Sequence, residues 1–192
     1  MGGAFQALGA WKAPPIAVAA VIRSREGTGL GEGGAVTWTV APADSFRPAL
    51  TREYLTDIIG RYYGRPATIA EVEQEMDDEV LPVYVEASWD GEPVGCLGMR
   101  IVEPGVGELT RMYVRESHRG LGGGGVLLNA VETAAVGLGI TKIRLDTRND
   151  LVEARALYAR HGYLEVDPYH DKLYAEHFFV KHLAQACYMP LT

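Results

Sequence analysis

The stretch LTRMYVRESHRGLGGGGVLL, residues 109–128, places a glycine-rich loop between a segment that alternates like a strand and a segment with helical periodicity. Glycines at such a junction let the backbone turn sharply and approach a ligand without Cβ atoms in the way. The first amides of the following helix lack partners within the helix, and with the helix dipole they attract an anion. Arg119 adds a full positive charge beside them. The stretch therefore predicts a strand, a loop that binds phosphate or pyrophosphate, and a helix.

Two familiar phosphate-binding patterns do not fit this loop. A P-loop ends in Gly-Lys-Ser/Thr, whereas residues 124–126 read Gly-Gly-Val. The dinucleotide fingerprint is met only through Gly120 and Gly122, and Asp146 is the one acidic residue placed to bind a ribose. A glycine-rich turn without a ligand is the remaining alternative, and Arg119 in front of the loop with a helix behind it argues against that alternative.

The rest of the sequence alternates between strand and helix patterns. Asp90-Gly91 is a strong hairpin signal, Thr68 with Glu71 forms a capping box, and Asp150 is expected to cap the last helix. Strands are predicted at 35–40, 82–89, 93–102, 107–114, 142–147, 163–166 and 176–183, and helices at 46–63, from 68 onward, at 123–138 and at 151–161. This order predicts an α/β fold with a mixed, partly parallel sheet and helices on its faces.

One domain is expected from residue 35 to residue 192, because its length suffices for a single buried core. Residues 1–34 are predicted to be a flexible or disordered extension, since the segment 27–34 is rich in glycine. An edge element or a misassigned start are the alternatives for the part before residue 27.

Composition narrows the partners and the compartment. The formal net charge of −7 argues against binding to nucleic acid or to an anionic membrane, and it mildly favours cationic substrates. The apolar run 16–22 is far shorter than the roughly 18–20 residues that span a bilayer. Cys96 and Cys187 have no CxxC spacing and indicate free thiols in a reducing, cytoplasmic setting. The five histidines have no ligand spacing, so no metal is expected.

A second block, residues 145–163, contains Leu145-Asp-Thr, Asn149 and Glu-Ala-Arg-Ala-Leu-Tyr158. Together with residues 109–128 it resembles the two coenzyme-contacting segments of the Gcn5-related N-acetyltransferases (GNAT). The family pattern Arg/Gln-x-x-Gly-x-Gly/Ala falls on Arg119, Gly122 and Gly124. The likeness covers about residues 85–183 and extends more weakly to residue 36. It implies the acyl-CoA N-acyltransferase fold, with a mixed central sheet of about six to seven strands flanked by about four helices.

The resemblance also implies a binding mode for acetyl-CoA as co-substrate. The strand 107–114 would splay from its neighbour and pair with the pantetheine arm through the main chain of Met112 and Val114, and the loop amides would hold the pyrophosphate. The implied coenzyme-binding residues are Met112, Tyr113, Val114, Arg119, Gly120, Leu121, Gly122, Gly123, Gly124, Asn149 and Tyr158. Four consecutive glycines weaken the first helical turn by up to about 1 kcal/mol each, which predicts a loop that is mobile until coenzyme binds.

Two residues are predicted to move protons. By the resemblance, Tyr158 protonates the departing thiolate, for which a phenol is well matched, and Glu108 serves as general base, often through water. The alternatives are a tyrosine that only packs its helix, and a strand-end glutamate that is in solvent or paired with Arg111. Asn149 could equally be a capping or turn residue.

The predicted activity is transfer of acetyl from acetyl-CoA to a primary amine by direct attack in a ternary complex. Neither cysteine has a setting that would activate it as a nucleophile. The acceptor, a small molecule or a peptide amine, would bind between the first helices and the last hairpin, as in the family. A non-catalytic acyl-CoA sensor and a transferase of longer acyl groups are the alternatives. The resemblance also suggests a homodimer.

Overall fold

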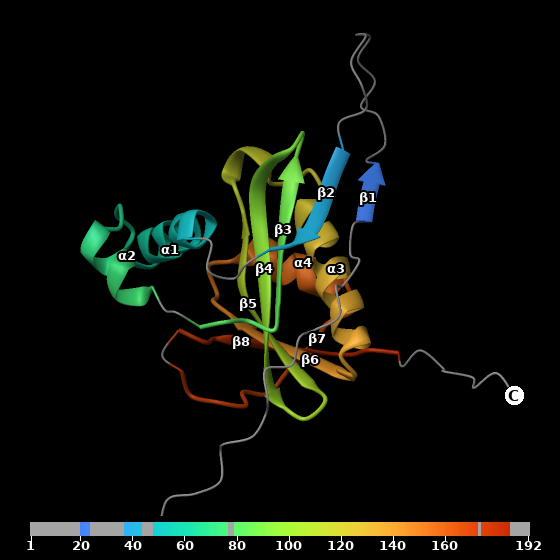
Figure 1. Cartoon of the computed structure of the whole chain (residues 1–192). Coiled ribbons are helices and arrows are strands. Elements are labelled where there is room, and N and C mark those ends of the chain that lie inside the picture. Colours follow the sequence, from blue (N-terminus) through green and yellow to red (C-terminus); the bar gives the residue numbers. More distant parts are fainter. Residues whose placement is uncertain (1–19, 24–36, 44–47, 77–78, 173, 185–192) are drawn as a thin grey trace, which may run out of the picture.

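The computed structural model describes residues 20–23, 37–43, 48–76, 79–172 and 174–184 (Figure 1). They form one eight-stranded sheet in the order β1-β2-β3-β4-β5-β6-β8-β7. The elements are β1 (Ala20–Arg23), β2 (Thr37–Pro42), α1 (Pro48–Tyr63), α2 (Ile69–Glu75), β3 (Val83–Trp89), β4 (Glu92–Glu103), β5 (Val106–Val114), the 3-10 helix η1 (Glu116–His118), α3 (Gly123–Gly137), β6 (Lys142–Thr147), α4 (Val152–Arg160), β7 (Leu164–Val166) and β8 (His177–His182). The predicted α/β class with a mixed sheet and four α-helices is confirmed.

The helices cover both faces of the sheet. Figure 1 shows α1 and α2 on one side and α3 with α4 on the other. Leu127 and Val131 of α3 are completely buried in the larger core, as the periodicity of that helix predicts. On the opposite face, Leu50 of α1 packs in a smaller cluster with Tyr84 and Cys96. None of the helices in the described part of the chain is long and apolar enough to cross a membrane.

The sheet splits between β5 and β6. These strands run parallel and pair only through Val106–Glu108, opposite residues 142–144. Both strands continue beyond this point without pairing to each other, so β5 splays away from β6 as predicted. On its other edge β5 pairs with β4, where Cys96 faces Tyr113 and Gly98 faces Thr110. The extra residue makes a bulge at which Arg111 has a φ of 56°.

Short-range signals define several element ends as expected. Asp90 and Gly91 both have positive φ, 49° and 86°, as a tight hairpin turn requires. Thr68 and Glu71 form the predicted capping box. The predicted cap of α4 is wrong, because Leu151 precedes the helix and makes no side-chain cap. The Asp150 carboxylate instead receives two hydrogen bonds from Arg148, at 2.8 and 2.6 Å.

The N-terminal region contributes one described element. Residues 20–23 form β1, an edge strand that pairs antiparallel with β2, so the edge-element alternative holds for these four residues. This strand raises the count to eight, above the six to seven expected. The other residues of the predicted 1–34 extension lie outside the described residues, and that prediction stays open for them.

Candidate functional site

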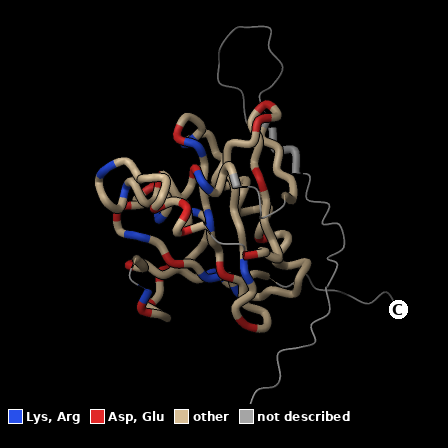
Figure 2. The backbone as a smooth tube through the Cα atoms, turned by 60° about the vertical axis from the view of Figure 1, so that its left-hand side comes forward, with Lys and Arg blue, Asp and Glu red and all other residues tan. Residues whose placement is uncertain are grey.

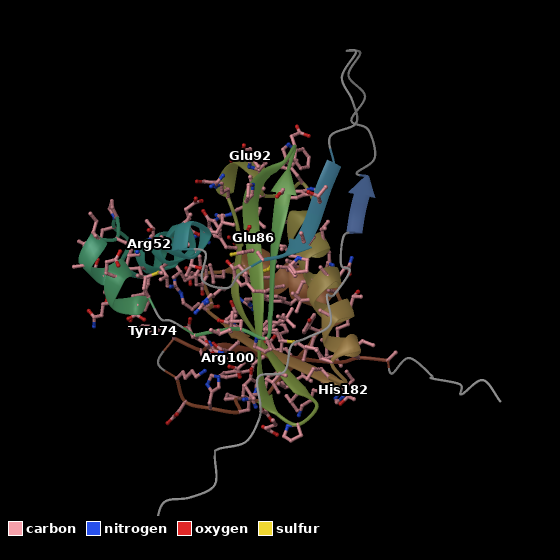
Figure 3. All side chains as sticks on the ribbon, in the orientation of Figure 1. Arg52, Glu86, Glu92, Arg100, Tyr174 and His182 are labelled. Carbon is pink, nitrogen blue, oxygen red and sulfur yellow. The ribbon has the colours of Figure 1, made fainter. Side chains whose placement is uncertain are left out.

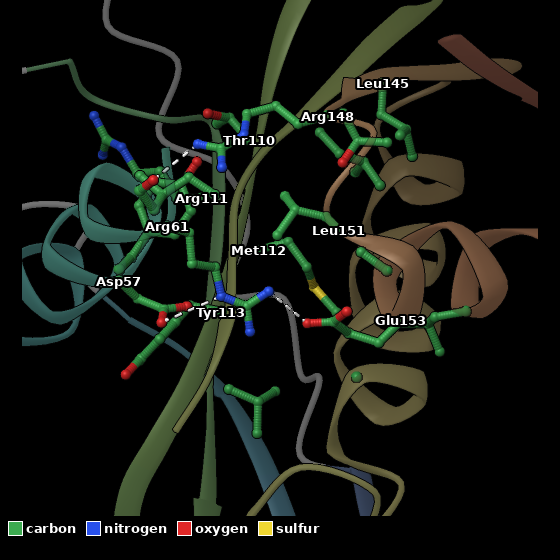
Figure 4. A pocket seen from close by; sticks show the side chains of 18 of the residues that line it. Asp57, Arg61, Thr110, Arg111, Met112, Tyr113, Leu145, Arg148, Leu151 and Glu153 are labelled. Carbon is green, nitrogen blue, oxygen red and sulfur yellow. Dashed lines mark hydrogen bonds and ion pairs between the residues drawn. The ribbon is translucent and has the colours of Figure 1, made fainter. Parts of the chain in front are cut away.

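The split in the sheet opens into a cleft of about 860 Å³. Figure 4 shows α1 on one side of β5 and α4 on the other. The cleft is lined by residues of α1, β5, the glycine loop, β6 and α4, and by a few residues of α2 and of the segment before β8. Figure 3 shows Tyr174, from that last segment, on the side of the sheet that carries α1 and α2. Two helices, a sheet edge and a loop thus converge on one cavity.

The main chain of β5 presents polar groups to this cleft. The amide of Arg115 donates to the Val94 carbonyl of β4 at 2.8 Å. Because successive residues of a strand point their peptide groups to alternate sides, Val114 and Met112 turn theirs away from β4, toward the split. The Val114 carbonyl accordingly accepts a hydrogen bond from Arg119 Nε at 2.9 Å. Met112, Tyr113 and Val114 all line the cleft. Their predicted contacts with pantetheine require this position.

The glycine loop ends the cleft with a row of backbone donors. Gly120 and Gly122 have φ of 77° and 90°, which glycine adopts without strain. Gly125 is the first residue of the helical turn to donate within the chain, to the Gly122 carbonyl at 3.0 Å. The amides of residues 120–124 have no acceptor among the residues that the structure describes. Free amides at a helix start, next to an arginine, are suited to a phosphate or pyrophosphate.

Leu121 differs from its neighbours in the loop. It does not line the cleft, its side chain is exposed, and its carbonyl accepts a hydrogen bond from the Trp38 indole at 2.8 Å. The other predicted coenzyme contacts in this loop line the cleft, namely Arg119, Gly120, Gly122, Gly123 and Gly124.

A series of ion pairs crosses the cleft from the loop to α4. Arg119 Nη2 lies 2.9 Å from Asp57 Oδ2 of α1. Arg61, one turn further along α1, contacts Asp57 at 3.5 Å and reaches Glu153 of α4 at 2.8 Å. Figure 4 shows the Arg61 guanidinium lying between these two carboxylates. The i, i+4 pair Asp57–Arg61 is visible in the sequence, but its partners, 62 and 92 residues away, are not.

Tyr158 belongs to α4 and lines the cleft. It is 5% exposed, and its ring packs against Tyr163 and Phe179 at centroid distances of 5.8 and 5.9 Å. Burial raises the pKa of its phenol well above the ordinary value. The group is therefore a neutral proton donor throughout the physiological range.

Glu108 lies at the point where the two strands separate and is 4% exposed. Its Oε2 accepts a hydrogen bond from Arg144 Nε at 2.9 Å. Its Oε1 lies 3.8 Å from Arg100 Nη1 and 3.6 Å from Lys172 Nζ. The alternative of a solvent-exposed glutamate at a strand end is therefore wrong. Glu108 is ion-paired, as the second alternative proposed, and its hydrogen-bonded partner is Arg144.

The structure does not bring Asn149 to the cleft. It is exposed in the loop after β6, where its amide donates to Glu176 at 2.8 Å. Its side-chain oxygen lies 3.2 Å from both Arg155 Nη1 and His177 Nε2. These contacts fit the turn role that the sequence left open, and the predicted coenzyme contact has no support in this geometry.

Charges of both signs are interspersed along the chain (Figure 2) and within the cleft. The lining carboxylates are Asp57, Glu71, Glu75, Glu108, Asp146 and Glu153, and the lining cations are Arg61, Arg100, Arg111, Arg119, Arg148, Arg160 and Lys172. The cleft thus lacks the acidic bias of the whole chain. Across the described part of the protein, no group of three or more His, Cys, Asp or Glu side chains is placed to hold a metal ion.

A split mixed sheet, a loop of glycines beside Arg119 and the buried phenol of Tyr158 thus meet at one cleft. The chain belongs to the acetyltransferase (GNAT) family, whose sequence model matches residues 47–163. It is 28% identical to an uncharacterized N-acetyltransferase of Schizosaccharomyces pombe over 135 residues, 66% of this chain and 79% of that protein. It is 37% identical to the uncharacterized N-acetyltransferase YjcF of Bacillus subtilis over 92 residues, 47% of this chain and 59% of that protein.

The fold agrees with solved structures of such enzymes. The PaiA N-acetyltransferase of Thermoplasma acidophilum, solved in complex with coenzyme A, superposes with a TM-score of 0.61 at 15% identity. The match covers 76% of this chain and 98% of that one. The predicted family and fold are thereby confirmed.

Proposed function

We propose that this protein transfers the acetyl group of acetyl-CoA to a primary amine by direct attack while both substrates are bound. The observation that carries the proposal is the row of amides at residues 120–124, which have no acceptor among the described residues. They follow Arg119, which lines the same cleft as Tyr158. The coenzyme bound by the structurally similar PaiA enzyme supports the choice of ligand.

The two ends of the coenzyme would meet different chemistry. The loop amides and Arg119 would hold the pyrophosphate, and the main chain of Met112 and Val114 would pair with the amides of the pantetheine arm. The thioester would then lie deeper in the split, in the region lined by Tyr158 and Glu108. Binding of the remote phosphates thus positions the reacting carbon without taking part in the reaction.

In the reaction the amine nitrogen attacks the thioester carbonyl carbon, a C–N bond forms, and the C–S bond breaks. The departing thiolate takes the proton of the Tyr158 hydroxyl, which its raised pKa keeps available. Glu108 Oε1 accepts the amine proton, directly or through water, because Oε2 is engaged by Arg144. Proton exchange with solvent restores both groups.

The acceptor would enter beside the end of α1. Tyr62 contacts Tyr63 and Tyr174 edge to face at centroid distances of 4.9 and 4.6 Å, and all three line the cleft while keeping about half of their surface exposed. This region combines the first helices with the segment before β8, where the acceptor was predicted to bind. Its open form is compatible with a small-molecule or a peptide amine.

Replacing Tyr158 by Phe tests the role of the phenol. The expected result is a fall in kcat of about a hundredfold with unchanged affinity for coenzyme A by calorimetry, since the ring and its packing remain. Tyr163→Phe is the matched control, because Tyr163 is equally buried and contacts Tyr158 but does not line the cleft. Unchanged turnover in the Tyr158 variant would remove this residue from the acid role.

The acceptor and the acyl group require a screen. An amine library assayed for release of free thiol from acetyl-CoA should identify one class of acceptor. Coenzyme binding without thiol release from any amine would favour the sensor alternative. Faster turnover with propionyl- or butyryl-CoA than with acetyl-CoA would favour the transferase of longer acyl groups.

A further inference from the structure

We infer that Trp38, far from the loop in sequence, is a positioning residue for the pyrophosphate loop, and this inference rests on the proposed function. The indole Nε1 of Trp38 donates to the carbonyl of Leu121, in the middle of the loop, at 2.8 Å. Residue 38 belongs to β2, which takes no part in the cleft. The contact joins strand and loop across 83 residues of sequence.

The indole is held firmly where it makes this contact. Trp38 is 1% exposed and faces Trp89 across the β2–β3 ladder. The two rings meet edge to face with centroids 4.9 Å apart, and Trp89 in turn meets His118, immediately before the loop, at 6.0 Å. A fully buried ring with such neighbours has one rotamer, so the position of its N–H is fixed by the core.

The hydrogen bond also fixes the direction of a loop amide. The carbonyl of Leu121 and the amide of Gly122 belong to one planar trans peptide, in which C=O and N–H point in opposite directions. Because Trp38 holds this carbonyl toward the sheet, the Gly122 amide points the other way, and Gly122 lines the cleft. Without the indole N–H, the peptide could rotate, because glycine at φ 90° has several accessible conformations.

The start of α3 shows the same dependence on Trp38. A Cβ atom on Gly123 would lie 2.5 Å from Cη2 of the indole, so only glycine lets the helix begin directly against this ring. On the next residue, Gly124, a Cβ would lie 2.7 Å from Leu157. The glycine run therefore brings the first helical turn into close packing, in addition to leaving its amides open. These contacts restrain the loop and therefore oppose the mobility that the sequence predicts for it when no coenzyme is bound.

The test is Trp38→Phe, which keeps an aromatic ring but removes the donor. We expect KM for acetyl-CoA, and the dissociation constant of coenzyme A, to rise about three- to tenfold, with kcat little changed. The KM for S-acetylpantetheine, which carries no pyrophosphate, should stay the same. Trp89→Phe is the matched control, because its ring packs on Trp38 while its indole makes no hydrogen bond to any described residue of the loop.

The outcomes separate this inference from the proposed function. Failure of the wild-type protein to bind coenzyme A overturns the proposed function. Wild-type binding with no change in Trp38→Phe, or an equal loss for both acetyl donors, overturns the positioning role. If the variant does not fold, hydrogen exchange of the Trp38 indole N–H in the wild-type protein is the alternative test. Its proton resonance, assigned with variants that lack the other tryptophans, should be protected from exchange with and without coenzyme A. Rapid exchange of that proton would overturn the inference.

Discussion

The two oxygens of the Glu108 carboxylate have unequal surroundings. Oε2 is bound to Arg144 Nε at 2.9 Å, which holds the carboxylate in one orientation. Oε1 has cations at 3.6 and 3.8 Å, too far for hydrogen bonds, so it can still accept a proton from an amine or a water molecule. A carboxylate that is anchored on one side and open on the other suits a general base.

Glu108→Gln should therefore reduce kcat by about a hundredfold, because the amide keeps the shape of the side chain and an acceptor for Arg144 but cannot take a proton. Turnover per folded molecule is the measurement, with folding checked by circular dichroism. Glu103→Gln is the matched control, since Glu103 also contacts Arg144, at 3.5 Å, but is largely exposed. A Glu108 variant with wild-type turnover and reduced stability would show that the residue is purely structural.

At the scale of elements, α1 is tied to the cleft at three points. Asp57 holds Arg119 of the loop, Arg61 reaches Glu153 of α4, and Arg148 donates to the Ile58 carbonyl at 2.8 Å. The first tie uses the same guanidinium that the proposed function assigns to pyrophosphate. Coenzyme and Asp57 would then compete for Arg119, so that binding of the coenzyme loosens α1, which also lines the acceptor end.

Asp57→Asn should bind coenzyme A more tightly, by about two- to fivefold, since a partly exposed ion pair is worth up to about 1 kcal/mol. Calorimetry at low and high salt measures the effect, which should shrink as salt screens the carboxylate. Glu53→Gln removes one charge from the same helix but acts on Arg115, so it controls for net charge. Weaker binding by the Asp57 variant would mean that Asp57 orients Arg119 and does not compete with the ligand.

Elements whose cause is local could be predicted from the sequence. The hairpin at Asp90-Gly91 and the capping box at Thr68 depend on residues within three positions, and both are present. The cap at Asp150 was wrong for an equally local reason, because Arg148 two residues earlier takes its carboxylate. The rule for helix caps names the preferred residue type, but it does not consider other side chains, such as that of Arg148, that can bind the same carboxylate.

The lining of the cleft was predictable where a segment carries its own motif, as the loop at 119–125 and the block with Tyr158 both do. The loop and the strand before it form a continuous stretch, so their placement in the cleft follows from their order along the chain. Trp38, Arg61 and Glu153 meet their partners only after the sheet has assembled, and neither periodicity nor spacing marks such pairs. Asn149 shows that a position which matches a motif need not lie in the cleft, because its surroundings are set by Glu176, Arg155 and His177.

At the scale of the whole molecule, the fold keeps several ionisable groups in their neutral form. Tyr84, Tyr158 and Tyr163 are between 2% and 5% exposed, and burial raises the pKa of each phenol well above its ordinary value. Burial also raises the pKa of the Cys96 thiol to about 12. These groups come from β3, β4, α4 and the start of the last hairpin, so the core as a whole favours protonated side chains.

Stability should therefore decline in alkali. A group whose pKa is higher in the folded protein binds its proton more tightly there, so its contribution is complete below the unfolded pKa and is lost as pH rises. We expect the free energy of unfolding to be constant between about pH 7 and 8 and to decline first above about pH 8.5, where the Cys96 thiol ionises in the unfolded chain. Above about pH 10 the decline should become steeper, because each buried phenol then removes about 1.4 kcal/mol per pH unit. Urea unfolding at pH 8, 10 and 11 measures this, and phenolate absorbance should appear together with unfolding. Tyr84→Phe should flatten the decline above pH 10 by one phenol; phenolate formation in the folded state near pH 10 by all the tyrosines would contradict it.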